Sequence, residues 1–526
     1  MRINDRPNVE TLIIGSLTAF AAVLQIVALK GRSIWVDENY SLLFASQPVP
    51  ELISLVMTYD VHPPTYYILL RLWTQLFGYS ELSLRSLSIL FGTLTVPVFY
   101  LLARQFFTRR GAFLATGLVA LSPYLHETAG TVRMYSLLVL VTIASYYTFV
   151  RLLDTWSGKW QLLYFLSSMV LIYTHIMGLT VIAAQSVQAF VRLWRTRSIK
   201  EARTLFTTGL GLGVAFLPWV FVVLNQAGKL AEKTQQPLPG ARDFFVLQLT
   251  FTGGVSAFRV FGFLSAIIIV ATFGLLSVVG IGGWILRQYH SSKFSDFSDN
   301  LIRDLSTDQG TIPIAFVWFS VPIVLQFGFA YIIPRTFDYH HMIMSIVPLF
   351  LLVTFGAITL SDDELLPVRT DAVFAVLVCI LIGASALGIS AGYASNPHPD
   401  WEEGATYVDN KAPSGAVIAF DASLIQRQFT YYSDRETQFE LYGYPESSPL
   451  IHGQESWPGI RSVDGKSDEV WFLASHASNE QDFVSMMNGA YTIAEKRDFG
   501  GLVVYRFVEE KTPQSVVNQT TTQSDY

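Results

Sequence analysis

Two neighbouring carboxylates, Asp37 and Glu38, follow an apolar run that is long enough to cross a bilayer. The run extends from Thr11 to Lys30, so the pair is expected near a membrane interface. A charge there is costly unless it is solvated, paired or used in chemistry. A carboxylate within hydrogen-bond reach of a hydroxyl can act as a general base. The alternative is a polar loop whose charges only face water.

A second polar block, Asp60 to Tyr67, brings a third carboxylate and the imidazole of His62 to the same surface. The Pro-Pro step after His62 ends any preceding helix and favours the start of the next, because proline fixes φ. The next segment, Thr65 to Phe77, is apolar but has only about 13 residues. It therefore suits a helix lying in the membrane interface better than a crossing helix.

The composition indicates a membrane protein with several crossing helices, which would position these two polar blocks. The chain has 526 residues, of which 51% are hydrophobic and 14% charged, and its mean hydropathy is +0.40. Apolar runs predict about 11 crossing helices, and at most about 13. Those after the first are Leu84 to Leu102, Gly111 to Tyr124, Met134 to Leu153, Gln161 to Tyr173, Met177 to Val191, Leu205 to Leu224, Phe261 to Ile285, Thr311 to Ile333, Met342 to Leu360 and Ala372 to Tyr393.

Lysine and arginine in the connecting loops predict the orientation, because cytoplasmic loops carry an excess of these residues. The densest basic stretch lies between Arg192 and Arg203, and all such stretches fall on one side if the N-terminus is cytoplasmic. The opposite side then holds the unusual polar residues, which predicts a site at the extracytoplasmic face of the cell membrane. These are Asp37, Glu38, Asp60, His62, Arg133, His175, Arg335, Asp338, His340 and His341.

The composition changes after Tyr393. Helical and strand patterns alternate, which predicts a small α/β domain outside the cytoplasm. From Pro397 onward there are 20 acidic and 9 basic side chains, so this part carries a formal charge of −11. It has no glycine-rich phosphate loop, so we expect no catalysis there. The predicted domains are a membrane domain over 1–393, the α/β domain over 394–511 and a disordered tail over 512–526.

Four ordered motifs resemble those of the GT-C glycosyltransferases, which are polytopic membrane enzymes. They are Trp35-Val36-Asp37-Glu38, His62-Pro63-Pro64-Thr65-Tyr66-Tyr67, Ser83-Leu84-Arg85-Ser86-Leu87-Ser88 and Arg133-Met134-Tyr135-Ser136-Leu137. The most similar branch contains the protein mannosyltransferases and aminoarabinose transferases, which use polyprenyl-phosphate sugars as donors. The resemblance implies a mainly α fold with a large first outward loop bearing interfacial helices.

The resemblance also implies roles for the carboxylates and for the basic residues. Asp37 is the expected general base, and Glu38 either supports it or only solvates the loop. His62 and Arg133 are expected to face the lipid phosphate, although His62 could instead cap a helix and Arg133 could anchor the interface. Arg85 is either a ligand or an ion partner of Glu81 on the adjacent turn.

The remaining candidates contact the donor only if the resemblance extends to them. Tyr66 and Tyr135 are either sugar-stacking groups or members of an interfacial aromatic belt. Arg335 and His340 precede the tenth span, where the family often has an Arg-Tyr pair. In this sequence Tyr339-His340-His341 stands where the family often has the Arg-Tyr pair, so the chain departs from the family's pattern there. His175 lies at a short outward turn, where we expect a structural role.

These features predict transfer of one sugar, with mannose favoured, from a polyprenyl or dolichyl phosphate. The expected acceptor is a hydroxyl of a lipid-linked glycan, with a lipid or a protein as alternatives, and no nucleic acid is involved. We expect no cofactor. A divalent cation is possible but not supported, because His340 and His341 are adjacent and point differently on a helix, and no carboxylate lies at helical spacing from both. The alternative function is a transporter or lipid flippase. It would favour charges inside the spans and an internal repeat, and the sequence displays neither.

Overall fold

The computed structural model describes residues 9–29, 32–233, 238–291, 311–332, 337–361, 370–394, 399–421, 425–443, 467–475, 480–488 and 491–509. Contacts divide the chain into two units. The helical unit comprises Met1–Lys30 and Tyr40–Asn396. The second unit comprises Pro397–Tyr526 together with Gly31–Asn39, the segment that carries Asp37 and Glu38.

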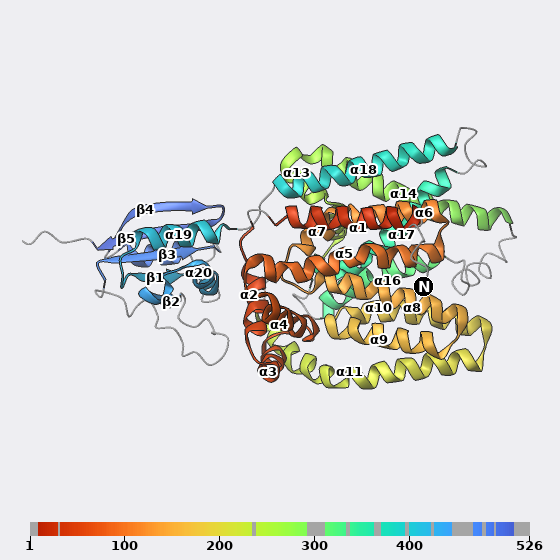
Figure 1. Ribbon diagram of the computed structural model, residues 1–526, viewed down its shortest axis with the longest axis horizontal. Coiled ribbons are helices and arrows are strands. Elements are labelled where there is room, and N and C mark those ends of the chain that lie inside the picture. The colour runs from red at the N-terminus through yellow and green to blue at the C-terminus, as the bar shows by residue number, and fades with distance from the viewer. Residues whose placement is uncertain are drawn as a thin grey trace, which may run out of the picture. The chain divides into compact units, whose positions relative to one another are not determined.

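Long helices that run roughly parallel dominate the helical unit (Figure 1). Every one of the 11 apolar runs expected to span the membrane forms a helix. The elements in chain order are α1 (Val9–Val27), α2 (Val36–Ser46), α3 (Val49–Tyr59), α4 (Thr65–Phe77), α5 (Glu81–Phe106), α6 (Arg109–Ala120), α7 (Pro123–Ala129), α8 (Tyr135–Thr155), α9 (Gly158–Thr174), α10 (Gly178–Thr196), α11 (Ile199–Lys233), α12 (Ala241–Thr252), α13 (Gly254–Phe261), α14 (Phe263–Ser291), α16 (Thr311–Ile332), the 3₁₀ helix η1 (Tyr339–Ser345), α17 (Ile346–Leu360) and α18 (Thr370–Ala394).

Within the described ranges, 8 helices are long and apolar enough to cross a membrane. The count becomes 9 if α12 and α13, which meet at a bend of 87°, form one broken span. Gly253 makes this bend: its φ of +77° lies in the left-handed region that favours glycine. A Cβ at this position would also come within 2.6 Å of Pro123.

The first outward loop forms α3 and α4 between the spans α1 and α5. As predicted, α4 begins directly after Pro64 and covers Thr65 to Phe77. It ends at Gly78, whose φ is +79°. Ser80 then caps α5 by accepting a hydrogen bond from the backbone N–H of Ser83. The chain thus returns from the loop to a crossing helix within a few residues.

The second unit is a five-stranded sheet with helices on both faces. The strand order is β2-β1-β3-β5-β4, and β1 pairs in parallel with β2 and β3 while the other pairs are antiparallel. One face packs around Trp401 and Trp471 and the other around Phe472 and Phe483. The elements are α19 (Trp401–Lys411), β1 (Val417–Phe420), α20 (Gln426–Tyr432), the 3₁₀ helix η3 (Glu436–Gln438), β2 (Glu440–Gly443), β3 (Glu469–Ala474), α21 (Glu480–Met487), β4 (Tyr491–Phe499) and β5 (Leu502–Glu509).

Candidate functional site

The carboxylate pair occupies the first turn of α2. Negative charge is favourable there, because the helix dipole is positive at its N-terminus. Glu38 is only 1% exposed, and its Oε2 accepts a hydrogen bond from the backbone N–H of Trp35 at 3.1 Å. Asp37 is half-buried. Glu38 therefore stabilises the start of the helix, while Asp37 is less buried than Glu38.

The segment before α2 is attached to the α/β domain. The backbone N–H of Ile34 donates to the hydroxyl of Tyr432 at 2.7 Å. The backbone N–H of Trp401 donates to Oγ of Ser33 at 3.1 Å. Val36 also packs against the apolar core around Trp401. The residues that directly precede the candidate base are therefore held by the C-terminal domain.

In the helical unit, one hydrogen-bond network joins the second motif to the fourth. Asp60 accepts the backbone N–H of His62 at 2.9 Å and the hydroxyl of Tyr67 at 2.6 Å. Nη1 of Arg133 donates to the same Tyr67 hydroxyl at 3.4 Å. Arg133 is 8% exposed, so it is not an arginine that extends into solvent. A buried guanidinium is well suited to bind an anion through two N–H groups.

Three histidines from three different loops meet beside this network. The rings of His62 and His175 stack with centroids 4.0 Å apart. The ring of His341 lies edge-on to both, at 5.7 Å from His62 and 5.3 Å from His175. His62 precedes α4, His175 caps the C-terminus of α9, and His341 lies in η1. The contacts between these three side chains are consistent with the prediction that their loops lie on one face of the membrane domain.

Burial sets the protonation of the polar groups in this cluster. It lowers the pKa of His62 to about 4 and that of His175 well below its ordinary value, an effect to which the neighbouring histidines and Arg133 add. Both imidazoles are therefore neutral near pH 7. Burial also raises the pKa of Tyr67 well above its ordinary value, so its phenol keeps the proton that it donates to Asp60.

His340 and Tyr135 lie next to the histidines. Their rings stack at 5.2 Å, and Nδ1 of His340 lies 2.9 Å from Oδ1 of Asp338. Burial alone would raise the pKa of Asp338, but the hydrogen bonds and charge of His340 and the charge of His341 lower it below its ordinary value. The ring centroid of Tyr135 also lies 6.3 Å from that of His175. Arg335 lies outside the described residues.

The structure gives Arg85 and Tyr66 local partners. Nη1 of Arg85 lies 3.5 Å from the carboxylate of Glu81, one turn earlier on α5. The hydroxyl of Tyr66, which is fully buried, bonds Oγ of Ser88 at 2.9 Å. Oγ of Ser88 in turn donates to the carbonyl of Arg133 at 3.3 Å. These bonds join α4, α5 and the loop that carries Arg133.

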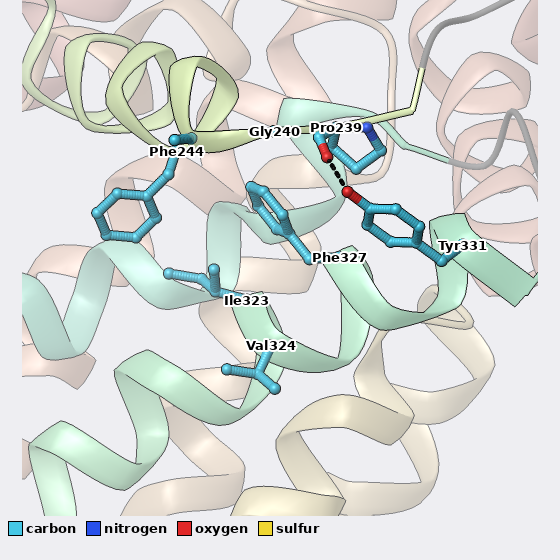
Figure 2. A pocket seen from close by; sticks show the side chains of 8 residues that line it. Pro239, Gly240, Phe244, Ile323, Val324, Phe327 and Tyr331 are labelled. Carbon is cyan, nitrogen blue, oxygen red and sulfur yellow. Dashed lines mark hydrogen bonds between the residues drawn. The ribbon is translucent and has the colours of Figure 1, made fainter.

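An apolar pocket of about 480 Å³ lies between the start of α12 and α16. Phe244, Phe327 and Tyr331 line it, and the hydroxyl of Tyr331 donates to the carbonyl of Pro239 at 2.7 Å (Figure 2). On the same helix α16, Nε2 of Gln326 lies 3.5 Å from Nδ1 of His341. Apolar walls of this kind accommodate hydrocarbon.

Sequence reasoning missed several parts of this network. The motifs contain Tyr67 but do not indicate that it joins Asp60 to Arg133, and the turn that holds His175 gives no sign of its contact with His62. The available signal was topological: Asp60, His62, His175 and His341 all fall in loops predicted to share one face. Spacing alone could not indicate contact, because His62 and His341 belong to loops far apart in the chain.

The comparisons with known proteins agree with this architecture. Residues 61–221 match the family described as dolichyl-phosphate-mannose-protein mannosyltransferase. The crystal structure of ArnT from Cupriavidus metallidurans bound to undecaprenyl phosphate superposes with a TM-score of 0.58 at 15% identity, covering 94% of this chain and 97% of that chain. The archaeal oligosaccharyltransferase AglB from Archaeoglobus fulgidus, in complex with an inhibitory peptide and a dolichol-phosphate, superposes with a TM-score of 0.50 at 12% identity, covering 95% and 75%.

The comparison with curated proteins found no match. The transporter alternative finds no support among the proteins that do match. At these identities the solved structures establish the fold, and the family match adds the region that contains His62, Arg85 and Arg133. The chain is thus a multi-pass membrane protein with the GT-C glycosyltransferase fold, and the resemblance inferred from its four motifs is confirmed.

Proposed function

We propose that the protein transfers a single sugar, with mannose favoured, from a polyprenyl- or dolichyl-phosphate donor to an acceptor hydroxyl at the extracytoplasmic face. One observation carries the proposal. Within the region that matches the dolichyl-phosphate-mannose family, His62, Tyr67 and Arg133 form one buried polar network. We favour a lipid-linked glycan as the acceptor, with a lipid or a protein hydroxyl as the alternatives.

The proposed reaction is a single displacement. Asp37 takes the proton of the acceptor hydroxyl while the hydroxyl oxygen forms a bond to the anomeric carbon of the sugar. The bond between that carbon and the phosphate oxygen breaks, and its electron pair leaves with the lipid phosphate. The guanidinium of Arg133 stabilises the departing phosphate through charge-assisted hydrogen bonds. Phosphate leaves without being protonated, so the reaction requires no second carboxylic acid.

The other groups position the substrates in this proposal. Glu38 supports the start of α2 and therefore the carboxylate of Asp37. The ring of Tyr135, stacked on His340, offers a surface for the sugar. The apolar pocket lined by Phe327 and Tyr331 suits the prenyl tail, because its walls are hydrocarbon.

The decisive experiment replaces the base without changing its shape. Purified Asp37→Asn protein is given labelled polyprenyl-phosphate sugars and candidate acceptors, and the product is identified by mass spectrometry. Loss of general-base catalysis is expected to lower kcat by about 10²–10⁴-fold. The matched control is Asp482→Asn, which changes an exposed aspartate on α21 of the same unit and is expected to retain full turnover. Full turnover by Asp37→Asn would exclude Asp37 as the base.

A further inference from the structure

Three histidine side chains lie close enough together to share one metal ion after small side-chain rotations. One ring nitrogen from each of His62, His175 and His341 lies within 4.8 Å of the other two. The centroids of His341 and its two neighbours are separated by 5.7 Å and 5.3 Å at steep interplanar angles. The rings of His62 and His175 stack on each other, and the ring of His341 meets both at an edge, so one ring nitrogen of each lies near the other two.

Two of the nitrogens in the cluster are buried without a hydrogen-bond partner. They are Nδ1 of His62 and Nε2 of His175, in side chains that are 7% and 0% exposed. Buried polar atoms in native proteins almost always have a partner, so each exception needs an explanation. A ligand that accepts electron pairs from several imidazoles would account for both.

We propose that His62, His175 and His341 bind one divalent transition-metal ion, with zinc as the preferred ion. Imidazole nitrogen suits zinc, copper and nickel, whereas magnesium and calcium prefer oxygen. Three histidines with an open fourth position form the ligand set of catalytic zinc sites. Under the proposed function, on which this last step rests, that position faces an oxygen of the donor phosphate. The ion then shares the phosphate charge with Arg133.

Binding requires two local adjustments. Nδ1 of His175 accepts the backbone N–H of Met177 at 3.1 Å, which places the ring proton on Nε2 in the metal-free protein. Coordination through Nε2 moves that proton to Nδ1 and exchanges this hydrogen bond for a metal bond. The stacked rings of His62 and His175 also rotate apart, because zinc–nitrogen bonds measure about 2.0–2.1 Å. Both changes are confined to side chains at loop positions.

This proposal departs from the expectation of no metal, which rested on the adjacent pair His340 and His341. Only His341 of that pair belongs to the cluster. Its two partners lie in the loop before α4 and in the turn between α9 and α10. No pattern within one helix could have predicted the set.

The test measures metal binding without any sugar donor or acceptor. Full-length protein in detergent is treated with a chelator, desalted and titrated with Co²⁺ or Zn²⁺ alone. We expect one bound ion per chain by elemental analysis and the visible absorption of four-coordinate Co²⁺. His62→Gln and His341→Gln should lose both signals. The matched control, His340→Gln, changes the neighbouring histidine and should retain both.

Three results would overturn the proposal. The first is a wild-type chain that binds no ion in the titration. The second is a His62→Gln protein that binds as much as wild type, and the third is a His340→Gln protein that loses the ion as fully as His62→Gln. Gel filtration of each variant establishes that it is folded. If the variants aggregate, the melting temperature of wild type is measured with and without Zn²⁺. A melting temperature that Zn²⁺ does not raise refutes the site. Because no substrate is present, these results are independent of the transfer assay on Asp37→Asn.

Discussion

Among single residues, Arg133 most clearly combines burial with a positive charge. It is 8% exposed and donates to Tyr67, which in turn donates to Asp60. An interface anchor would extend its guanidinium toward water or lipid headgroups. The observed burial beside neutral histidines instead favours binding of an anion within the protein.

Replacement of Arg133 tests this interpretation. Arg133→Ala removes the guanidinium that we propose holds the leaving phosphate. A hydrogen bond to a charged group contributes about 1.5–3 kcal/mol, so kcat/KM for the donor should fall by about 10–100-fold. Arg133→Lys should recover part of the loss, because lysine keeps the charge without the bidentate geometry.

The control for this prediction is Arg259→Ala, which changes an exposed arginine on α13 and should not alter the kinetics. A purely structural role would give a different pattern. Arg133→Ala would then unfold at a lower temperature, while the folded fraction kept its normal kcat/KM.

For single residues, the sequence predicts which side chains lie on the same side of the membrane, but not which of them are in contact. His62, Arg133, His175 and His341 were all assigned to outward loops from the positive-inside pattern. Their contacts depend on how the helices between them pack, which hydropathy does not encode. Tyr67 shows the limit clearly: an aromatic residue in an apolar run gives no sign of its bonds to Asp60 and Arg133.

Among the elements, the α14–α17 pair shows how glycine sets helix packing. A Cβ at Gly280 would come within 2.9 Å of the carbonyl oxygen of Leu352. A Cβ at Gly356 would overlap the carbonyl oxygen of Leu276. Small residues at a helix interface allow backbones to approach closely, and this approach drives association inside a membrane.

The close approach predicts a large effect from a single methyl group. Gly356→Ala forces α14 and α17 apart, and overpacking of this kind costs about 1–3 kcal/mol. The melting temperature of the detergent-solubilised protein should fall accordingly. Gly274→Ala, at an open position on the same α14, serves as the control and should leave it nearly unchanged. Equal melting temperatures for the two variants would contradict the packing argument.

The hydropathy of the sequence predicted most of the helices of the membrane domain, but it missed some shorter elements. It located α4 within the outward loop and α6, α9 and α10 as apolar helices, because a long apolar run can satisfy its backbone only as a helix. It missed the broken pair α12 and α13, since each half is short and Gly253 interrupts the pattern. It also missed β2, whose four residues include an exposed glutamate.

For the whole molecule, the distribution of charge makes a prediction about orientation. The connection between α10 and α11 carries Arg195, Arg197 and Lys200. The positive-inside rule therefore places it in the cytoplasm and the C-terminal domain outside. The only cysteine, Cys379, can be replaced by serine to give a background for labelling.

In that Cys379→Ser background, Thr492→Cys places a thiol on an exposed position of β4 and Lys200→Cys places one at the start of α11. An impermeant maleimide should label Thr492→Cys in intact cells and Lys200→Cys only after lysis. Labelling of Lys200→Cys in intact cells would reverse the topology and exclude an extracytoplasmic site.

The attachment of residues 31–39 to the α/β domain constrains any attempt to exchange modules between such enzymes. The hydrogen bond from Ile34 to Tyr432 spans 398 positions in the chain, and Ser33 accepts from Trp401 just as remotely. A chimaera that imports a foreign domain after residue 396 would deprive the acidic pair of these supports. Successful grafting must therefore transplant both pieces together, even though they lie far apart in the chain.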